Sequence, residues 1–107
     1  MLARRSLEWS PRARRSYDNF LDELAEKNAL AALEFNDDVL EKLSLIQVYP
    51  KLYRESTRVV GVREMVIRPN FFIVYRVLRT KLRILNFEHS RRNWPQPPSR
   101  TSPRRRR

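Results

Sequence analysis

The chain has no cysteine, one histidine and one glycine among its 107 residues. Without cysteine it cannot form a disulfide, a zinc site built from thiolates or a cysteine nucleophile. One histidine leaves too few nitrogen ligands for a transition-metal site of the usual type, and one glycine excludes the glycine-rich loops that bind phosphates. We therefore expect neither a metal nor another cofactor.

Long apolar runs are also absent. No stretch approaches the ~18 apolar residues that a membrane-spanning helix requires, and no apolar segment follows Arg4 and Arg5 to make a secretory signal. The length corresponds to a single domain, which can bury a core without disulfides or metals. We expect a cytoplasmic protein that does not contact a membrane.

Acidic residues are scarce in the second part of the chain. Residues 1–42 carry seven basic and nine acidic side chains, whereas residues 43–107 carry sixteen basic and three acidic ones. Since Glu64 and Glu88 are the only acids among the last 50 residues, a hydrolase with paired carboxylates is hard to build there. The net charge of +11 indicates a positive face for a polyanion or an acidic protein segment. The alternative is a basic surface that has no ligand.

A strand and an amphipathic helix are predicted near the start of the chain. The strand covers residues 7–9. Ser10 and Pro11 then supply a hydroxyl cap and a proline at the first helical position, which together favour a helix start. Lys27 and Asn28 suit the helix end, because cations and residues that tolerate the left-handed conformation favour that position. The apolar face of this helix consists of Tyr17, Phe20, Leu21 and Leu24.

A second helical pattern begins near Leu30 and stops at Pro50. Its apolar face keeps spacings of three and four and consists of Ala32, Phe35, Val39, Leu43 and Ile46. Because so few residues separate the two helices, they should form an antiparallel hairpin. Neither helix can bury its apolar face alone, so a sheet must cover them.

Three strands are predicted after the hairpin, over residues 62–68, 71–77 and 82–88. Residues 57–62, which contain Gly61, could be strand or turn. The middle strand is the clearest, because it is rich in aromatic and β-branched residues. One of its sides carries Phe71, Ile73, Tyr75 and Val77, and the other carries Phe72, Val74 and Arg76. A turn over residues 79–81 connects it to the last strand.

This order predicts an α+β domain. An N-terminal strand and a helical hairpin pack on one face of a mainly antiparallel, twisted sheet, and the first strand joins that sheet. Because no helix remains for the other face, we expect it to be open and basic. The domain covers residues 1–97, and the proline, serine and arginine composition of residues 98–107 predicts a disordered tail.

Six short motifs occur in a set order along the chain. They are Trp9-Ser10-Pro11-Arg12-Ala13, Ala31-Ala32 with Phe35, Val48-Tyr49-Pro50, Val62-Arg63-Glu64, Tyr75-Arg76-Val77 and His89-Ser90-Arg91-Arg92-Asn93-Trp94-Pro95. In this order and spacing, residues 7–95 resemble the RelE/ParE toxins of bacterial toxin–antitoxin pairs, some of which serve plasmid stabilisation. The resemblance implies a growth-inhibiting toxin that a cognate antitoxin holds inactive. We expect an acidic, amphipathic segment of that antitoxin to wrap onto the toxin.

The family has two functional branches. RelE-like members cut messenger RNA in the ribosome, and ParE-like members are linked to DNA gyrase. The nucleases typically carry an arginine two residues before the Val-Tyr pair of the third strand, where this chain has Phe72. The C-terminal motif and the Val62-Arg63-Glu64 element resemble the ParE side more closely. We therefore expect a ParE-like toxin that binds its target and is not an enzyme. The alternatives are a ribosome-dependent endoribonuclease and a non-toxic module that binds RNA or DNA.

His89 is the one candidate for a catalytic residue, since an imidazole titrates near neutrality and could shuttle a proton. It could equally be structural. Arg91 and Arg92 could bind phosphates or the carboxylates of an acidic partner, because each guanidinium can contact two oxygens. Trp94 could cover the edge of the core or bind a target.

Arg63, Arg76 and Arg83 should project from the sheet. Arg76 shares a face with Phe72, and an arginine beside an aromatic ring suits a nucleic acid or a peptide groove. The alternative is a cross-strand ion pair between Arg76 and Glu64. The candidate residues for binding the target or the antitoxin are Arg63, Phe72, Arg76, Arg91, Arg92 and Trp94.

Overall fold

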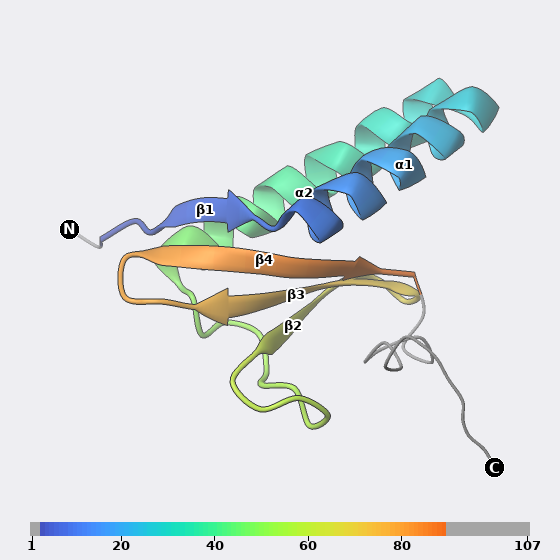
Figure 1. The fold of residues 1–107 in the computed structure, drawn as a ribbon. Coiled ribbons are helices and arrows are strands. Elements are labelled where there is room, and N and C mark those ends of the chain that lie inside the picture. Colours follow the sequence, from blue (N-terminus) through green and yellow to red (C-terminus); the bar gives the residue numbers. More distant parts are fainter. Residues whose placement is uncertain (1–2, 90–107) are drawn as a thin grey trace, which may run out of the picture.

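Two helices cover one side of a four-stranded sheet (Figure 1). The computed structural model describes residues 3–89. The elements follow the chain as β1 (Ser6–Trp9), α1 (Pro11–Lys27), α2 (Ala29–Val48), β2 (Arg63–Arg68), β3 (Phe71–Val77) and β4 (Lys81–Glu88). This α+β architecture confirms the predicted fold class. Within the described residues, neither helix has the length and apolar character needed to cross a membrane.

The sheet is mixed, with the strand order β1-β4-β3-β2. β2 and β3 pair antiparallel, as do β3 and β4, whereas β1 pairs parallel with β4. The prediction of a mainly antiparallel sheet that includes the first strand is therefore correct. Residues 57–62, which could have been strand or turn, lie outside the strands.

The start of α1 is attached to the sheet. The Ser10 hydroxyl accepts a hydrogen bond from the Ala13 amide at 3.1 Å, as an N-cap should, and donates one to the Leu85 carbonyl at 3.1 Å. The Ser10 amide also donates to the Ile84 carbonyl at 2.8 Å. One residue therefore caps the helix and fixes its position on β4.

Asn28 alone separates the two helices and caps both of them. Its amide donates to the Leu24 carbonyl at 2.8 Å, and its side chain accepts from the Ala31 amide at 3.0 Å. The predicted helix end at Lys27 and Asn28 is confirmed, although Asn28 is extended, with φ −161° and ψ 97°, and not left-handed. An extended N-cap is the geometry that lets a side chain reach the first turn of the following helix.

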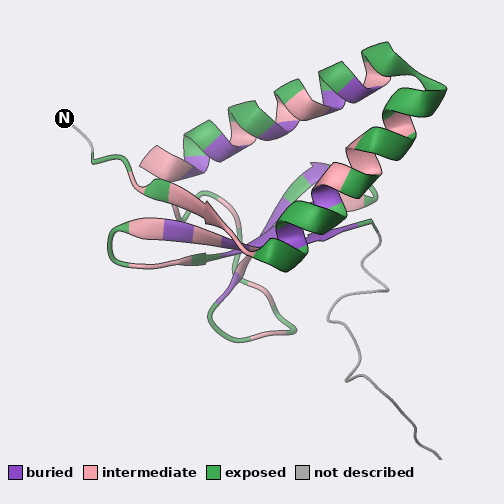
Figure 2. Ribbon diagram, turned by 45° about the horizontal axis from the view of Figure 1, so that its top comes forward, coloured by how far each residue is buried: buried purple, intermediate pink, exposed green. Residues whose placement is uncertain are grey.

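The main core lies between the helices and the sheet, and buried residues follow the facing sides of both layers (Figure 2). All five predicted apolar residues of α2 are buried, and Phe35 lies at the centre of a group of rings. The group consists of Tyr17, Phe20, Phe35, Phe71 and Phe87. Neighbouring rings in it have centroids 4.8 to 6.4 Å apart. Because the rings come from both helices and from two strands, they join the two layers.

We call the side of the sheet away from the helices the outer face. The prediction that it is open was wrong at Phe72 and Val74, whereas Arg76 on the same face is exposed. Phe72 is 1% exposed and Val74 is fully buried. Val62, which belongs to the loop between α2 and β2, packs on both, with Val59 beside it. Figure 1 shows this loop passing to the side opposite the helices. The physical reason is that β3 has apolar side chains on both faces, and each face needs a cover.

A bulge in β4 adjusts its two faces. Tyr75 pairs with Ile84, but the preceding Val74 pairs with Asn86, so Leu85 is the extra residue. As a result Ile84 and Phe87, three positions apart, both belong to the main core, while Leu85 packs in the cluster on the outer face. Bulges of this kind redirect side chains without ending a strand.

Candidate functional site

His89 lies just beyond β4, on the side of the helices. Its ring stacks on Phe71 with 4.5 Å between ring centroids and 8° between planes. Together with Phe20, Glu23, Leu24 and Lys27 it lines a hollow of about 190 Å³. A stacked, exposed imidazole in this position can make a structural contact or bind a small group. Whether it is catalytic stays a prediction.

Phe72 cannot offer its ring to a partner in this conformation. It lies between Val66 of β2 and Glu88 of β4 in the strand register, and it is almost fully buried. An apolar ring at this position provides no charge that could stabilise a phosphate. Phe72 therefore contributes to the cluster that attaches the loop to the outer face.

Arg63 does not project freely from the sheet. Its guanidinium donates to the Tyr53 carbonyl at 2.8 Å. Close to it in the register, the Tyr75 hydroxyl donates to the Pro50 carbonyl at 2.7 Å. These two bonds hold the first part of the loop after α2, which gives Arg63 a structural task. A further role of Arg63 in binding a partner stays a prediction.

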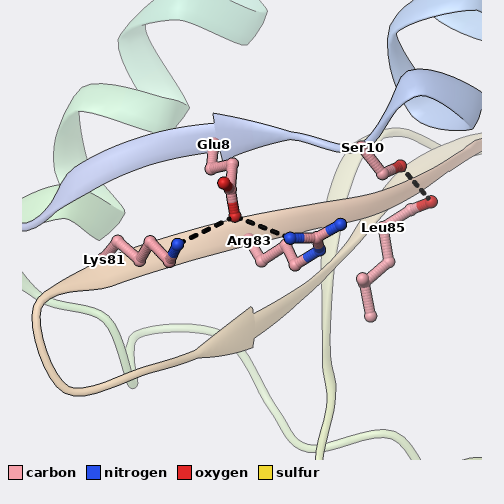
Figure 3. Close-up of polar contacts among 5 residues, drawn as sticks. All are labelled: Glu8, Ser10, Lys81, Arg83 and Leu85. Atoms are coloured by element: carbon pink, nitrogen blue, oxygen red, sulfur yellow. Dashed lines mark hydrogen bonds and ion pairs between the residues drawn. The ribbon is translucent and has the colours of Figure 1, made fainter.

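Three charged residues form a row across the outer face. Arg76 of β3 is directly opposite Arg83 of β4, which is directly opposite Glu8 of β1. Arg83 lies 2.7 Å from the Glu8 carboxylate, and Lys81 lies 3.2 Å from the same oxygen (Figure 3). Arg76 is exposed and makes no ion pair or hydrogen bond with another side chain of residues 3–89.

The predicted ion pair between Arg76 and Glu64 is absent. Glu64 is opposite Val74 in the register, and its carboxylate lies 3.5 Å from Arg54 of the loop. Because Val74 precedes Arg76 by two residues on β3, Glu64 is a diagonal and not a direct neighbour of Arg76. Arg54 was not among the predicted site residues, because nothing in the sequence indicates that this loop returns to the sheet.

The cations around Glu8 alter its titration. A hydrogen bond from Lys81 and the charges of Lys81 and Arg83 hold the pKa of the Glu8 carboxyl below its usual value, against a smaller opposing effect of desolvation. Glu8 is therefore ionised at neutral pH and partly neutralises the row. Glu8 and Lys81 were missed as site residues, since only the pairing of β1 with β4 brings them together.

The row and the histidine are separated from each other. Lys81 and Arg83 lie at the beginning of β4, whereas His89 follows its end. The six residue-to-residue steps from Arg83 to His89 correspond to about 20 Å of extended chain. Since they also lie on different sides of the sheet, His89 and the arginine pair cannot act on the same atom of one ligand.

Three predicted binding residues, Arg91, Arg92 and Trp94, lie outside the described residues 3–89, as does the predicted tail over residues 98–107. Within residues 3–89, no three histidine, cysteine, aspartate or glutamate side chains are close enough together to hold a metal ion.

Comparison with known protein families gives a match over most of the chain. A family model described as the ParE toxin of the type II toxin–antitoxin system parDE matches residues 7–94. A search of curated proteins gave no significant match. The matched residues extend from the second residue of β1 to five positions beyond His89, so they include both helices, β2, β3, β4 and all of β1 except Ser6.

Several solved structures have a similar fold. The chromosomal ParDE toxin–antitoxin system from P. aeruginosa is 24% identical with a TM-score of 0.67, and the match covers 80% of this chain and 96% of that chain. The YoeB dimer from Staphylococcus aureus is 19% identical with a TM-score of 0.58, covering 80% and 97%. The E. coli DinJ–YafQ toxin–antitoxin complex is 16% identical with a TM-score of 0.50, covering 80% and 92%.

Proposed function

The chain belongs to the ParE toxin family of type II toxin–antitoxin systems, and from this premise we propose that it stops growth by binding a cellular target in the cytoplasm, with DNA gyrase as the candidate. The observation that carries the proposal is the family match over residues 7–94, which spans the helical hairpin and all of the described sheet except Ser6. In this proposal the protein acts as a binding toxin and not as a nuclease.

The arrangement of charges supports binding over RNA cleavage. Phe72, at the position where the nucleases carry an arginine, is buried and apolar. His89 lies at the other end of β4 from Arg83, and among residues 3–89 Lys27 is the one cation that lines its hollow. Loss of one electrostatic contact to the reacting group typically lowers a rate by about a hundredfold to a thousandfold. A histidine alone, which contributes about 10²–10⁴-fold, is a weak basis for a nuclease.

We also propose that a cognate antitoxin neutralises the toxin through an acidic, amphipathic segment. Residues 49–89 carry nine basic and three acidic side chains, whereas residues 11–48 carry five basic and eight acidic ones. An acidic segment is therefore attracted to the sheet and its loop more than to the helices. Two of the similar structures are a toxin–antitoxin system and a toxin–antitoxin complex, which supports a partner of this kind.

Growth tests the toxin itself. Induced expression of the protein should stop bacterial growth, and co-expression of a small gene adjacent to its own should restore it. The control is the same induction with the insert out of frame. Normal growth at high, verified soluble expression contradicts the toxin proposal.

Transcript mapping and DNA topology separate the two branches. After induction we expect no codon-phased messenger RNA ends, together with altered supercoiling of a reporter plasmid. Toxicity should depend more on Arg91 and Arg92, substituted together by glutamine, than on His89, substituted by alanine, since the task is binding. Codon-phased cuts that vanish with His89→Ala would establish the endoribonuclease alternative instead.

Salt tests the electrostatic part of antitoxin binding. Between about 0.05 M and 0.5 M salt the Debye length falls below ~5 Å. Association of toxin and antitoxin should slow far more than dissociation, because charge governs the encounter and apolar burial governs residence. Stopped-flow measurements that give a salt-independent association rate would remove this part of the proposal.

A further inference from the structure

The direct opposition of Arg76 and Arg83 requires an explanation. Like charges directly opposite each other across two strands destabilise a sheet, and here two arginines are direct register partners on neighbouring strands. Within residues 3–89, the carboxylate that contacts this pair is Glu8, and Glu8 also contacts Lys81. Glu8 thus contacts two of the three neighbouring cations, Arg83 and Lys81, and leaves Arg76 without a carboxylate among these residues. The row therefore keeps an attraction for a further anion.

The geometry of the row leaves Arg76 accessible to such an anion. Glu8 belongs to β1, which lies on one side of β4, whereas Arg76 belongs to β3 on the other side. Glu8 thus engages Arg83 but not Arg76. Directly opposite residues have Cβ atoms about 4.5–5.5 Å apart, so the long side chains of Arg76 and Arg83 can bring their guanidiniums to one carboxylate.

We propose that Arg76 and Arg83 form a two-arginine site for a carboxylate of an extended acidic protein segment, and that Glu8 is the internal competitor that holds Arg83 while the site is empty. On binding, the incoming carboxylate takes Arg83 from Glu8, and Glu8 keeps Lys81. Where the segment belongs to the antitoxin, this inference rests on the proposed function and deepens it.

The surroundings of the row favour a protein segment over a nucleic acid. Single-stranded nucleic acids bind through exposed aromatic rings as well as cations. Phe72, the aromatic residue that the described strands place on the outer face, is buried. The loop that covers this face presents aliphatic side chains, with Val60 94% exposed and Val59 partly buried. A face that carries both cations and aliphatic side chains matches a segment in which acidic and apolar residues alternate.

The proposal predicts that removing the negative charge of Glu8 strengthens the binding of an acidic peptide. The probe is a fluorescein-labelled peptide of ten glutamates, with binding followed by anisotropy at low salt on the full-length protein. Glu8→Gln should tighten binding by about threefold to fivefold, and Arg76→Gln and Arg83→Gln should each weaken it by about fivefold. A fivefold change corresponds to roughly the upper limit of one exposed ion pair, about 1 kcal/mol.

Matched controls separate the site from general charge effects. Glu26→Gln and Arg12→Gln make the same charge changes on the exposed surface of α1 and should alter binding less than twofold. The second measurement is the NMR shift of the Arg76 and Arg83 side-chain N–H groups on adding peptide, which does not depend on toxicity. Thermal melting of each variant establishes that it is folded, and Glu8→Asp, which keeps the charge but shortens the reach, replaces Glu8→Gln if that variant unfolds.

The outcomes are distinct. Weaker or unchanged binding by the Glu8 variant, or an Arg76 variant that behaves like Arg12→Gln, overturns the site. A ten-residue oligothymidylate that competes as well as the peptide overturns the choice of a protein segment. If growth arrest fails while the peptide shows the predicted pattern, the proposed function is wrong and the site stands. If growth arrest and rescue hold without the pattern, the site is wrong and the proposed function stands.

Discussion

The two faces of the sheet differ in what they bury and what they leave exposed. The helix-facing side belongs to a core cluster of thirteen buried residues that draws rings from both helices and two strands. The outer face has a cluster of three, Val62, Phe72 and Val74, covered by a loop. Its remaining positions include the charged row of Glu8, Arg83 and Arg76. Apolar burial thus holds the fold on one face, and charge is available for recognition on the other.

The largest expected effect compares two buried rings. Phe35 is 2% exposed on the helix side and Phe72 is 1% exposed on the outer face. We expect Phe35→Ala to lower the free energy of unfolding by about 3–5 kcal/mol, the usual cost for a buried ring. Phe72→Ala should cost less, about 3 kcal/mol or below, because a covering loop can collapse into the cavity more readily than two packed helices.

Urea unfolding of both variants measures this difference. Leu33→Ala, which removes an exposed side chain of α2, is the control and should change the free energy of unfolding by less than about 0.5 kcal/mol. Equal losses at the two rings, or a larger loss at Phe72, would show that the outer face is as rigid a core as the helix side.

The next effect concerns Tyr75, which lies on the helix side but anchors the loop that reaches the outer face. Burial raises the pKa of Tyr75 to about 12 and also raises the pKa of Tyr17. An unfolded tyrosine loses its proton near pH 10, whereas these two keep theirs. The unfolded state therefore binds fewer protons in this window, so the free energy of unfolding falls as pH rises from about 10 to about 12.

Tyr75→Phe should have two consequences. At pH 7 it leaves the Pro50 carbonyl without its 2.7 Å hydrogen bond, which costs about 1 kcal/mol. Between about pH 10 and 12 the decline of stability should become shallower by up to about 1.4 kcal/mol per pH unit. Urea unfolding at pH 7, 10 and 11 tests both. The control is Tyr49→Phe, at a residue 52% exposed, which should not change how the free energy of unfolding falls with pH. If Tyr75→Phe does not change this fall either, burial of the Tyr75 hydroxyl is not its cause.

The smallest expected difference is between two helix caps. Ser10 caps α1 and also bonds to the Leu85 carbonyl of β4, whereas Asn28 caps α2 at the exposed end of the hairpin. Ser10→Ala should cost about 1–2 kcal/mol and Asn28→Ala about 0.5–1 kcal/mol. Thermal unfolding of the two variants measures the difference. A larger loss at Asn28 would mean that the hairpin is stabilised mainly within itself and not by its contact with the sheet.

Periodicity and capping residues predicted most of the fold. The spacing of three and four in α2 identified all five of its buried residues, and Ser10 with Pro11 identified the start of α1. The bulge at Leu85 had a signal that went unused, because Leu82, Ile84 and Phe87 cannot share one side of a regular strand. The candidate site was less accessible to sequence reasoning. Phe72 was expected to be exposed, and Glu8 and Lys81 were not expected at all.

Local sequence thus determined which residues form helices and strands and which side of each is apolar, since these depend on neighbours within a few positions. The total charge and the excess of basic residues after residue 42 follow directly from the composition of the sequence. Only the tertiary structure decided that the loop after α2 covers the outer face, and that β1 beside β4 places Glu8 next to Arg83. Both depend on pairings between segments distant in sequence, where register and direction are set by the packing of the whole sheet and not by any local pattern.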